Sequence, residues 1–393
     1  MSKMFFLSTT FNKGGASHCA IEIYNELKNR NEIFLVNLFP DSNFASSEVS
    51  DAVITLSSTI HGSKVRRASI YLIILLRYVR LLYSKYPHVS MSINSLSHIF
   101  NILACKITSV KPVIAVHDLP TYFSTMDIFG KIMKEMPMYM CKYLGIKNII
   151  TVSQGLKDLL VDTYNIEPSN ISVIYNPLDI TKITQLSCDE IKEALFHVDI
   201  PIIITVGNVI PVKGHWHLLR IFERIRGIIP CKLVICGHID LDTQYYEYLQ
   251  TIVKAMKYKE DVYFTGWVSN PYKYMAKSTV FVLSSLSEGF SYVIIESMIC
   301  GCPIVSADCN VGPRELLENG KYGFLSKPLD EVYYSLKDSL TEAEIDMMEK
   351  IMLMLTDNQR RSNFIEIAKL RATEFDKEVI FKKYTDYFSC INR

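Results

Sequence analysis

Short, continuous runs of apolar residues recur along the chain and alternate with longer stretches in which apolar residues follow a helical period. A continuous apolar run predicts a strand buried on both faces, because a strand with one wet face would alternate apolar and polar residues. In the first half the runs lie at 4–10, 32–39, 52–56, 89–93, 112–118, 148–153 and 171–176. Helical periods separate them, as at 18–30. The first half therefore predicts strands and helices in alternation.

The same alternation restarts near residue 200. The later runs lie at 201–207, 232–237, 261–266, 280–285 and 303–308, with helical patterns such as 215–227 and 242–258 between them. Strand, helix and strand at this spacing predict right-handed crossovers and a doubly wound parallel sheet. The fold class predicted is therefore α/β, with two Rossmann-like domains.

The segment 175–201 carries no strand pattern and is interpreted as a linker with a short helix. We place the domains at 1–178 and 200–372, and we expect a last amphipathic helix, about 375–393, to pack back onto the first domain. Open α/β sheets bind ligands at the carboxyl ends of their strands. Two such domains facing each other would form a ligand-binding cleft.

Composition narrows the class of protein. The chain has 393 residues, of which 49% are hydrophobic, as is ordinary for a globular protein. Its net charge is only +1, so no general affinity for polyanions follows. The apolar run 70–76 is far too short to span a bilayer, and the first residues show no secretory pattern. The ten cysteines lack paired Cys-x-x-Cys spacing, so we expect buried thiols in a reducing cytoplasm.

Charge is distributed unevenly. The segment 52–117 contains no Asp or Glu but eight Lys and Arg residues, which favours an anionic partner such as lipid headgroups or a phosphorylated lipid. Within it, the helical pattern at 64–86 places Arg77, Arg80 and Ser84 on one face and apolar residues around most of the rest. Such a pattern is typical of a helix that faces a core and also of an anchor on a membrane surface. We expect loose, peripheral association of a cytoplasmic protein with the membrane through residues 64–111.

Two glutamates flank a small, turn-forming centre where a strand at 280–285 gives way to a helix that stops at Gly301. Gly289, Phe290 and Ser291 lie at the amino end of that helix, where free N–H groups and the helix dipole attract anions. Glu288 precedes the turn, and Glu296 lies roughly 7 Å farther along the helix axis. Carboxylates accept hydrogen bonds from hydroxyl groups. A ligand with phosphates in the middle and hydroxyls at both ends, such as a sugar nucleotide, would fit.

The pattern E-G-F-S-x-x-x-x-E at 288–296 resembles the E-x7-E signature of retaining glycosyltransferases with the GT-B fold, specifically glycosyltransferase family 4. The stretches "FNKGGASHCAIEIYNEL", "VGNVIPVKGHWHLLRIF" and "GCPIVSADCNVGPRELLENGKYGFL" also resemble this family, in its order and over most of the chain. The resemblance implies transfer of a hexosyl group, with retention, from a nucleotide diphosphate sugar. It favours a UDP-sugar as co-substrate, no other cofactor, and a lipid-linked or saccharide acceptor in surface polysaccharide or glycoconjugate synthesis.

The resemblance also implies roles for single residues in the second domain. Glu296 matches the glutamate that binds the ribose hydroxyls, Glu288 the one near the donor sugar, and Lys213 the lysine that pairs with the diphosphate. Gly289, Phe290 and Ser291 would offer backbone donors to phosphate or sugar. Backbone groups around Trp267 and Val268 are candidates for base recognition.

In the first domain, the resemblance points to two positions. Gly15 lies in a strand-to-helix turn, where the missing Cβ lets the backbone approach a phosphate or an acceptor closely. His117, at the end of a strand, resembles the histidine that touches the donor hexose, and it is grouped with Glu288 as a catalytic candidate. Its neighbour Asp118 is a weaker candidate.

One position departs from the family. Where the family often has arginine, this chain has Asn208, and an amide cannot neutralise a phosphate charge. Either Lys213 and the helix dipole suffice, or another cation such as Arg314 helps.

We expect no metal. His215 and His217 stand at i and i+2 of a helix and cannot aim at one ion. Two alternatives to a glycosyltransferase stay open, a sugar-nucleotide 2-epimerase of the same fold and a non-catalytic sugar-nucleotide-binding protein.

Overall fold

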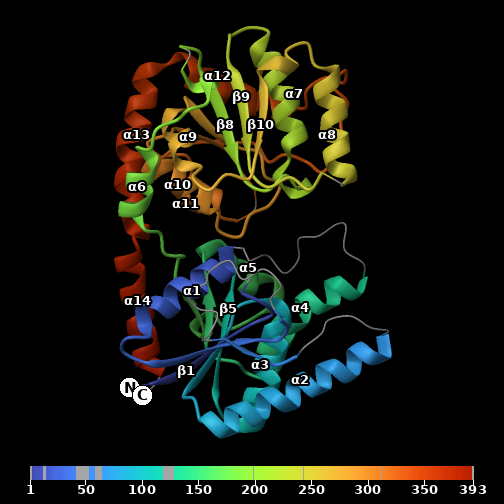
Figure 1. Ribbon diagram of the computed structural model, residues 1–393, viewed down its shortest axis with the longest axis vertical. Helices are drawn as coiled ribbons and strands as arrows, with labels where there is room; N and C mark the ends of the chain where they lie inside the picture. Colours follow the sequence, from blue (N-terminus) through green and yellow to red (C-terminus); the bar gives the residue numbers. More distant parts are fainter. Residues whose placement is uncertain are drawn as a thin grey trace. The chain divides into compact units, whose positions relative to one another are not determined.

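A computed structural model describes residues 2–11, 15–40, 53–57, 64–117, 128–197, 199–241, 243–309 and 311–391. The chain divides into two compact units, Met1–Pro177 with Glu378–Arg393, and Leu178–Lys377 (Figure 1). In each unit, helices pack against one sheet in which every paired strand is parallel. The predicted α/β class with two doubly wound sheets is confirmed.

The sheet of the first unit has seven strands, and all seven predicted runs contribute one. From edge to edge they are β3 (Val53–Thr55), β2 (Glu32–Asn37), β1 (Lys3–Ser8), β4 (Val89–Ser92), β5 (Lys111–Val116), β6 (Ile149–Thr151) and β7 (Ile171–Val173). The strand order reverses direction between β1 and β4, and ligands of doubly wound sheets bind at the carboxyl side of such a switch point.

Successive side chains of β1 point to opposite faces of this sheet, and each face has its own helices. Met4 and Phe6 pack in a cluster with α1 (Gly15–Leu27) and α14 (Lys377–Ile391). Phe5 and Leu7 pack in another with α2 (Lys64–Lys85) and α3 (Ser95–Thr108). Figure 1 shows α14 and α1 on one side of the sheet and α2 and α3 on the other. Two further helices, α4 (Ile128–Tyr143) and α5 (Gln154–Tyr164), contribute to a third cluster.

The sheet of the second unit has six strands and its switch point lies between β8 and β11. The order is β10 (Val262–Gly266), β9 (Lys232–Cys236), β8 (Ile202–Val206), β11 (Val280–Leu283), β12 (Ile304–Ala307) and β13 (Phe324–Ser326). Five of these were predicted; β13 was not, because only two consecutive apolar residues, Phe324 and Leu325, stand between Gly323 and Ser326. The helices are α6 (Ile180–Ser187), α7 (His215–Arg226), α8 (Gln244–Ala255), α9 (Tyr272–Lys277), α10 (Tyr292–Cys300), α11 (Pro313–Leu316), α12 (Glu342–Thr356) and α13 (Asn358–Ala372).

A buried ionic cluster joins α7 to α12 in the second unit. The carboxylate of Glu344 accepts hydrogen bonds from Nε and Nη2 of Arg220, at 2.9 and 3.0 Å, and lies 2.8 Å from Nδ1 of His217. These partners hold the pKa of Glu344 down, at about 2, although burial by itself would raise it. The other ring nitrogen of His217 lies 2.9 Å from the carbonyl oxygen of Asp330. Both nitrogens of this ring are therefore engaged in the fold.

Three of the sequence expectations concern groups spread over the molecule. All ten cysteines are free thiols, and eight of them are buried; Cys188 and Cys390 are exposed. Within the described ranges, no group of three or more His, Cys, Asp or Glu side chains is arranged to hold a metal ion. None of the helices in that part of the chain is both long enough and apolar enough to span a bilayer.

Candidate functional site

The loops that follow β8 and β11 are tied together at the switch point of the second unit. Gly214, the N-cap residue of α7, has a φ of 60°, and a Cβ there would lie 2.2 Å from the carbonyl oxygen of Ser284. Only glycine permits that approach. The hydroxyl of Ser284 donates to the carbonyl of Lys213 at 2.9 Å, and the amide of Leu286 donates to the carbonyl of Val212 at 2.8 Å. The two loops therefore hold each other in a fixed arrangement.

This arrangement brings Lys213 and Glu288 into contact, 75 residues apart in the sequence. The Nζ of Lys213 donates to Oε1 of Glu288 at 2.6 Å, and the side chains are only 22% and 10% exposed. The hydroxyl of Ser285 donates to the same carboxylate oxygen at 2.6 Å. The stem of Lys213 lies beside Gly207, at ordinary van der Waals distance from the point where a Cβ of that residue would stand. An ammonium group is thus held, partly desolvated, at the carboxyl edge of the sheet.

Helix α10 starts four residues after Glu288. Its N-cap residue is Ser291, which has a φ of 72°. Its C-cap residue is Gly301, with a φ of 69°, so the predicted end of the helix is confirmed. The hydroxyl of Ser291 is buried and has no hydrogen-bond partner within the described part of the chain. Phe290 is buried and packs edge-on against Phe375, which fixes the turn. The amino end of this helix therefore carries a buried hydroxyl group, that of Ser291, close in sequence to Glu288.

Glu296 lies one turn into α10, in contact with Tyr272 of α9. The Tyr272 hydroxyl donates to Oε1 of Glu296 at 3.2 Å. Burial raises the pKa of the Glu296 carboxyl to about 7, and the hydrogen bond from Tyr272 offsets part of that rise. Glu296 is half-buried, and one hydrogen-bond donor offsets only part of the cost of withdrawing its carboxylate from water. The site therefore contains a carboxylate that gains from further donors such as ligand hydroxyls.

The backbone at the ends of β8 and β9 is packed too tightly for side chains. A Cβ on Gly237 would lie 1.9 Å from the carbonyl oxygen of Gly207. The exposed residue Asn208 follows Gly207 directly. Its amide occupies the position at which the family often carries an arginine.

Arg314 is the second residue of the short helix α11, and its guanidinium pairs with the carboxylate of Asp308, with Nε at 3.0 Å from Oδ1. Asp308 follows β12, so the pair lies at the same carboxyl edge as Lys213. The pairing with Asp308 raises the pKa of the guanidinium further. Val268, in the loop after β10, is half-buried on this edge as well.

The two candidates of the first unit lie at the carboxyl edge of its own sheet. Gly15 is the first residue of α1, in the connection after β1. His117 follows β5 directly and is half-buried. Asp118 lies outside the described residues.

Sequence reasoning missed the side chains that hold the candidates in place. Ser285, Tyr272 and Asp308 each make a hydrogen bond to a predicted residue, yet none of them stands in a distinctive motif. A serine or an aspartate within two residues of the end of a buried strand was the available signal for Ser285 and Asp308. Tyr272 had none, because its contact with Glu296 joins two helices 24 residues apart.

Comparison with protein families gives one match for each half of the chain. Residues 13–182 match the model described as "Glycosyltransferase Family 4", and residues 188–371 match "Glycosyl transferases group 1". Together the two matches cover about nine-tenths of the chain, and the break between them falls in the segment interpreted as a linker.

Individual relatives are glycosyltransferases by name. An uncharacterized glycosyltransferase of Methanocaldococcus jannaschii is 28% identical over 298 residues, which span 70% of this chain and 71% of the relative. An N-acetylgalactosamine-N,N'-diacetylbacillosaminyl-diphospho-undecaprenol 4-alpha-N-acetylgalactosaminyltransferase of Campylobacter jejuni is 31% identical over 239 residues, or 61% of this chain and 59% of the relative. The match thus spans less than two-thirds of that second protein.

Among solved structures, the Anabaena protein HepE in complex with UDP superposes with a TM-score of 0.77 at 20% identity, covering 99% of this chain and 100% of that one. This likeness concerns the fold. The matches to both family models, one for each parallel α/β unit, place the chain among the glycosyltransferases of the GT-B fold.

Proposed function

We propose that the protein transfers a hexosyl group from a nucleotide diphosphate sugar, most readily a UDP-sugar, to a lipid-linked or saccharide acceptor, with retention at the anomeric carbon. The product would belong to a surface polysaccharide or another glycoconjugate. The observation that carries the proposal is the grouping of Lys213, Glu288 and the start of α10 at the switch point of the second unit. It provides a cation and a helix amino end for phosphates, with a carboxylate on either side of the turn.

Each part of this grouping has a chemical task. Lys213 and the amino end of α10 would bind the diphosphate and stabilise the negative charge that develops on it as the bond to the sugar breaks. Glu296 would accept hydrogen bonds from the ribose hydroxyls. The contact between Lys213 and Glu288 means that a diphosphate competes for the lysine, so binding of the donor would loosen Glu288 to accept hydroxyls of the donor sugar.

Retention follows, in this proposal, from attack on the face that the diphosphate leaves. The acceptor hydroxyl would approach an oxocarbenium-like sugar there, and a phosphate oxygen of the leaving group would take its proton. Glu288 orients the sugar and is not assigned as a nucleophile. His117, in the first unit, is proposed to touch the donor hexose, and Gly15 to give the backbone room near phosphate or acceptor. No metal takes part in this scheme, so an excess of chelator should leave the rate unchanged.

The test is incubation with a panel of UDP- and GDP-sugars, with release of nucleotide as the readout. We expect slow hydrolysis of one donor, acceleration by a lipid-linked acceptor, and an anomeric configuration in the product equal to that of the donor, read by NMR. The variant Glu288→Gln should lose turnover while it keeps UDP binding. The matched control is Glu366→Gln on the exposed face of α13.

Two outcomes would overturn the proposal. Appearance of the 2-epimer of a sugar would identify an epimerase. Binding of a sugar nucleotide without any turnover, across the whole panel and with acceptors present, would identify a non-catalytic binding protein, and Asn208 in place of arginine would then be the first residue to restore.

A further inference from the structure

The first unit exposes large apolar side chains on a helix that is already packed on its other side. In α2, Ile74, Tyr78 and Leu82 are fully buried against the sheet. On the opposite side of the same helix, Leu72, Ile73 and Leu76 are 58, 47 and 60% exposed. The helix therefore faces a core on one side and presents aliphatic residues outward on the other.

This exposed side continues onto α3. Of the 22 exposed large hydrophobic residues in the described part of the chain, 11 lie between residues 72 and 144. The hydroxyl of Tyr83 on α2 donates to the carbonyl of Ile107 on α3 at 3.0 Å, which joins the two helices into one surface. We define the α2–α3 face by its exposed residues: Leu72, Ile73, Leu76, Arg80, Tyr83, Leu103, Lys106 and Ile107.

The charged residues on the α2–α3 face are all basic. Neither helix contains an Asp or Glu, while Arg80 and Lys106 are both exposed. Arg77 is different, because its guanidinium donates to the carbonyl of Leu56 at 2.6 Å. Cations on long, flexible side chains beside protruding aliphatic groups match a bilayer, whose interior takes the aliphatic groups and whose headgroups meet the cations.

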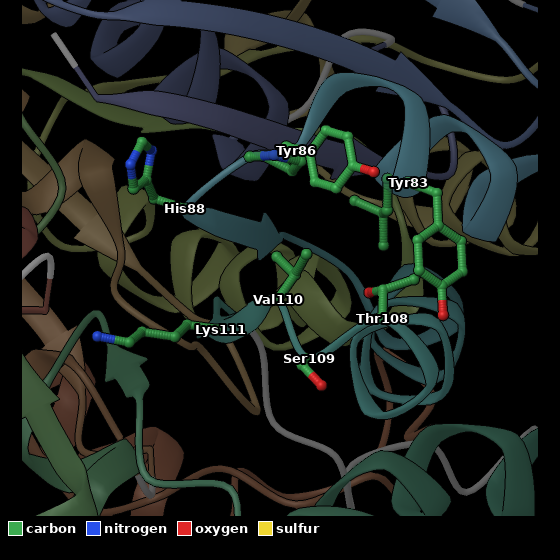
Figure 2. A pocket seen from close by; sticks show the side chains of 9 residues that line it. Tyr83, Tyr86, His88, Thr108, Ser109, Val110 and Lys111 are labelled. Atoms are coloured by element: carbon green, nitrogen blue, oxygen red, sulfur yellow. The ribbon is translucent and has the colours of Figure 1, made fainter.

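A hollow of about 340 Å³ opens where α2 ends. Figure 2 shows Tyr83 and Tyr86 toward one end of it, Val110 in the middle, and His88 and Lys111 toward the other end. A second hollow of about 440 Å³ shares Ser109, Val110 and Lys111 with it and adds Lys106 and Lys147 to the lining. Tyrosines with lysines behind them are typical of the level of lipid headgroups, where a ring has one apolar and one wet end.

We propose that the α2–α3 face docks on a bilayer that carries anionic phospholipids, with Leu72, Ile73 and Leu76 inserted among the acyl chains and headgroups reaching the hollow beside Lys111. A protein partner is the less favoured occupant, because the centre of the face offers aliphatic groups without the polar partners that a specific interface places around them. This docking does not depend on the transfer reaction, so it is tested without any nucleotide.

The experiment is co-sedimentation of the full chain with vesicles. One set consists of phosphatidylcholine alone and another of equal parts phosphatidylcholine and phosphatidylglycerol. We expect binding to the anionic set that weakens as salt is added, and at least tenfold weaker binding to the neutral set. The pair Leu72→Ser and Leu76→Ser should weaken binding by on the order of tenfold. Removing Arg80 and Lys106 as alanines should weaken it by about fivefold for each cation.

Matched control variants carry substitutions of the same types outside the α2–α3 face. Ile228→Ser with Leu370→Ser removes two exposed aliphatic residues from the second unit, and Lys254→Ala with Lys382→Ala removes two exposed cations from α8 and α14. Both control pairs should bind vesicles like the unchanged protein. All variants are exposed-surface changes, and equal thermal midpoints confirm that each is folded.

Three results would overturn the proposal. The first is absence of binding to anionic vesicles. The second is equal weakening by the α2–α3 pairs and by the control pairs. The third is a dimer in sedimentation analysis that Leu72→Ser with Leu76→Ser dissociates while vesicle binding persists, which would assign the face to a second copy of the chain.

Discussion

Glu296 should make the second unit less stable at neutral pH, and Glu296→Gln should therefore stabilise it. The folded-state pKa of this carboxyl is about 7, raised by burial from the ordinary value of 4.5. In the window between these values the unfolded chain has released its proton and the folded protein still holds it, so stability falls as pH rises through the window. The resulting cost is about 1 kcal/mol at pH 5 and about 3 kcal/mol at pH 8, because each pKa unit corresponds to about 1.4 kcal/mol.

Glutamine keeps a carbonyl oxygen for the Tyr272 hydroxyl and removes the buried charge. For a unit of this size, about 3 kcal/mol corresponds to a rise in melting temperature of roughly 6–12 °C. The assay is thermal unfolding of both proteins at pH 5 and pH 8, together with calorimetric titration of UDP at pH 8. We expect Glu296→Gln to melt higher, mainly at pH 8, and to bind UDP about tenfold more weakly, because a charged acceptor for the ribose hydroxyls is gone.

Glu366→Gln, an exposed position on α13, controls for the loss of one negative charge from the same unit. The reasoning is refuted if Glu296→Gln melts lower than the unchanged protein at pH 8, or if the difference in melting temperature is the same at both pH values. Unchanged UDP affinity would instead refute the assignment of Glu296 to the ribose and leave the stability argument intact.

Three further predictions concern the same unit. Lys213→Met should weaken UDP binding by about ten- to a hundredfold and leave uridine binding unchanged, because only the diphosphate loses a charged donor; equal losses in calorimetry for both ligands would contradict this. Glu344→Gln should lower the free energy of unfolding at pH 7 by about 3–5 kcal/mol, since it leaves a buried guanidinium without its carboxylate. Because the pKa of Glu344 is held at about 2, the difference in unfolding free energy between the two proteins should stay constant above pH 4.5 and shrink as pH falls from 4.5 toward 2. Denaturant titrations measure this difference, and a difference that does not change with pH would contradict the prediction. Gly237→Ala should lower the melting temperature far more than Gly145→Ala, because a Cβ would meet a carbonyl oxygen at 1.9 Å in the first case and open space in the second; similar shifts for both would argue against the close contact.

The periodicity of the sequence was sufficient for most of the architecture. Twelve of the 13 strands correspond to runs of apolar residues, since a buried parallel strand must be apolar on both faces. The helix from Tyr292 to Cys300 and its stop at Gly301 were also predictable, because a left-handed cap at a helix end favours glycine. The strand β13 was missed because its apolar run is only Phe324 and Leu325, whereas the equally short strands β3, β6 and β7 lie within longer apolar runs.

The chemistry of the site was predictable only in part. Glu288, Glu296 and Lys213 could be named from local pattern and family resemblance. Their partners could not, because each partner comes from a different loop or helix. The pairing of Arg314 with Asp308 was likewise not predictable. The sequence identified Arg314 as a cation near a strand end, but it did not show that a neighbouring carboxylate binds its guanidinium.

The sequence by itself determined most of the strands and helices, that they form two parallel sheets, and that one stretch lacks acidic residues. These properties depend on neighbours along the chain, and local pattern records them. Only the tertiary structure decided that Lys213 meets Glu288, that burial raises the pKa of the Glu296 carboxyl, and that α2 carries aliphatic residues on its outer face. Those properties depend on which atoms surround a side chain in space, and groups distant in the sequence set that environment.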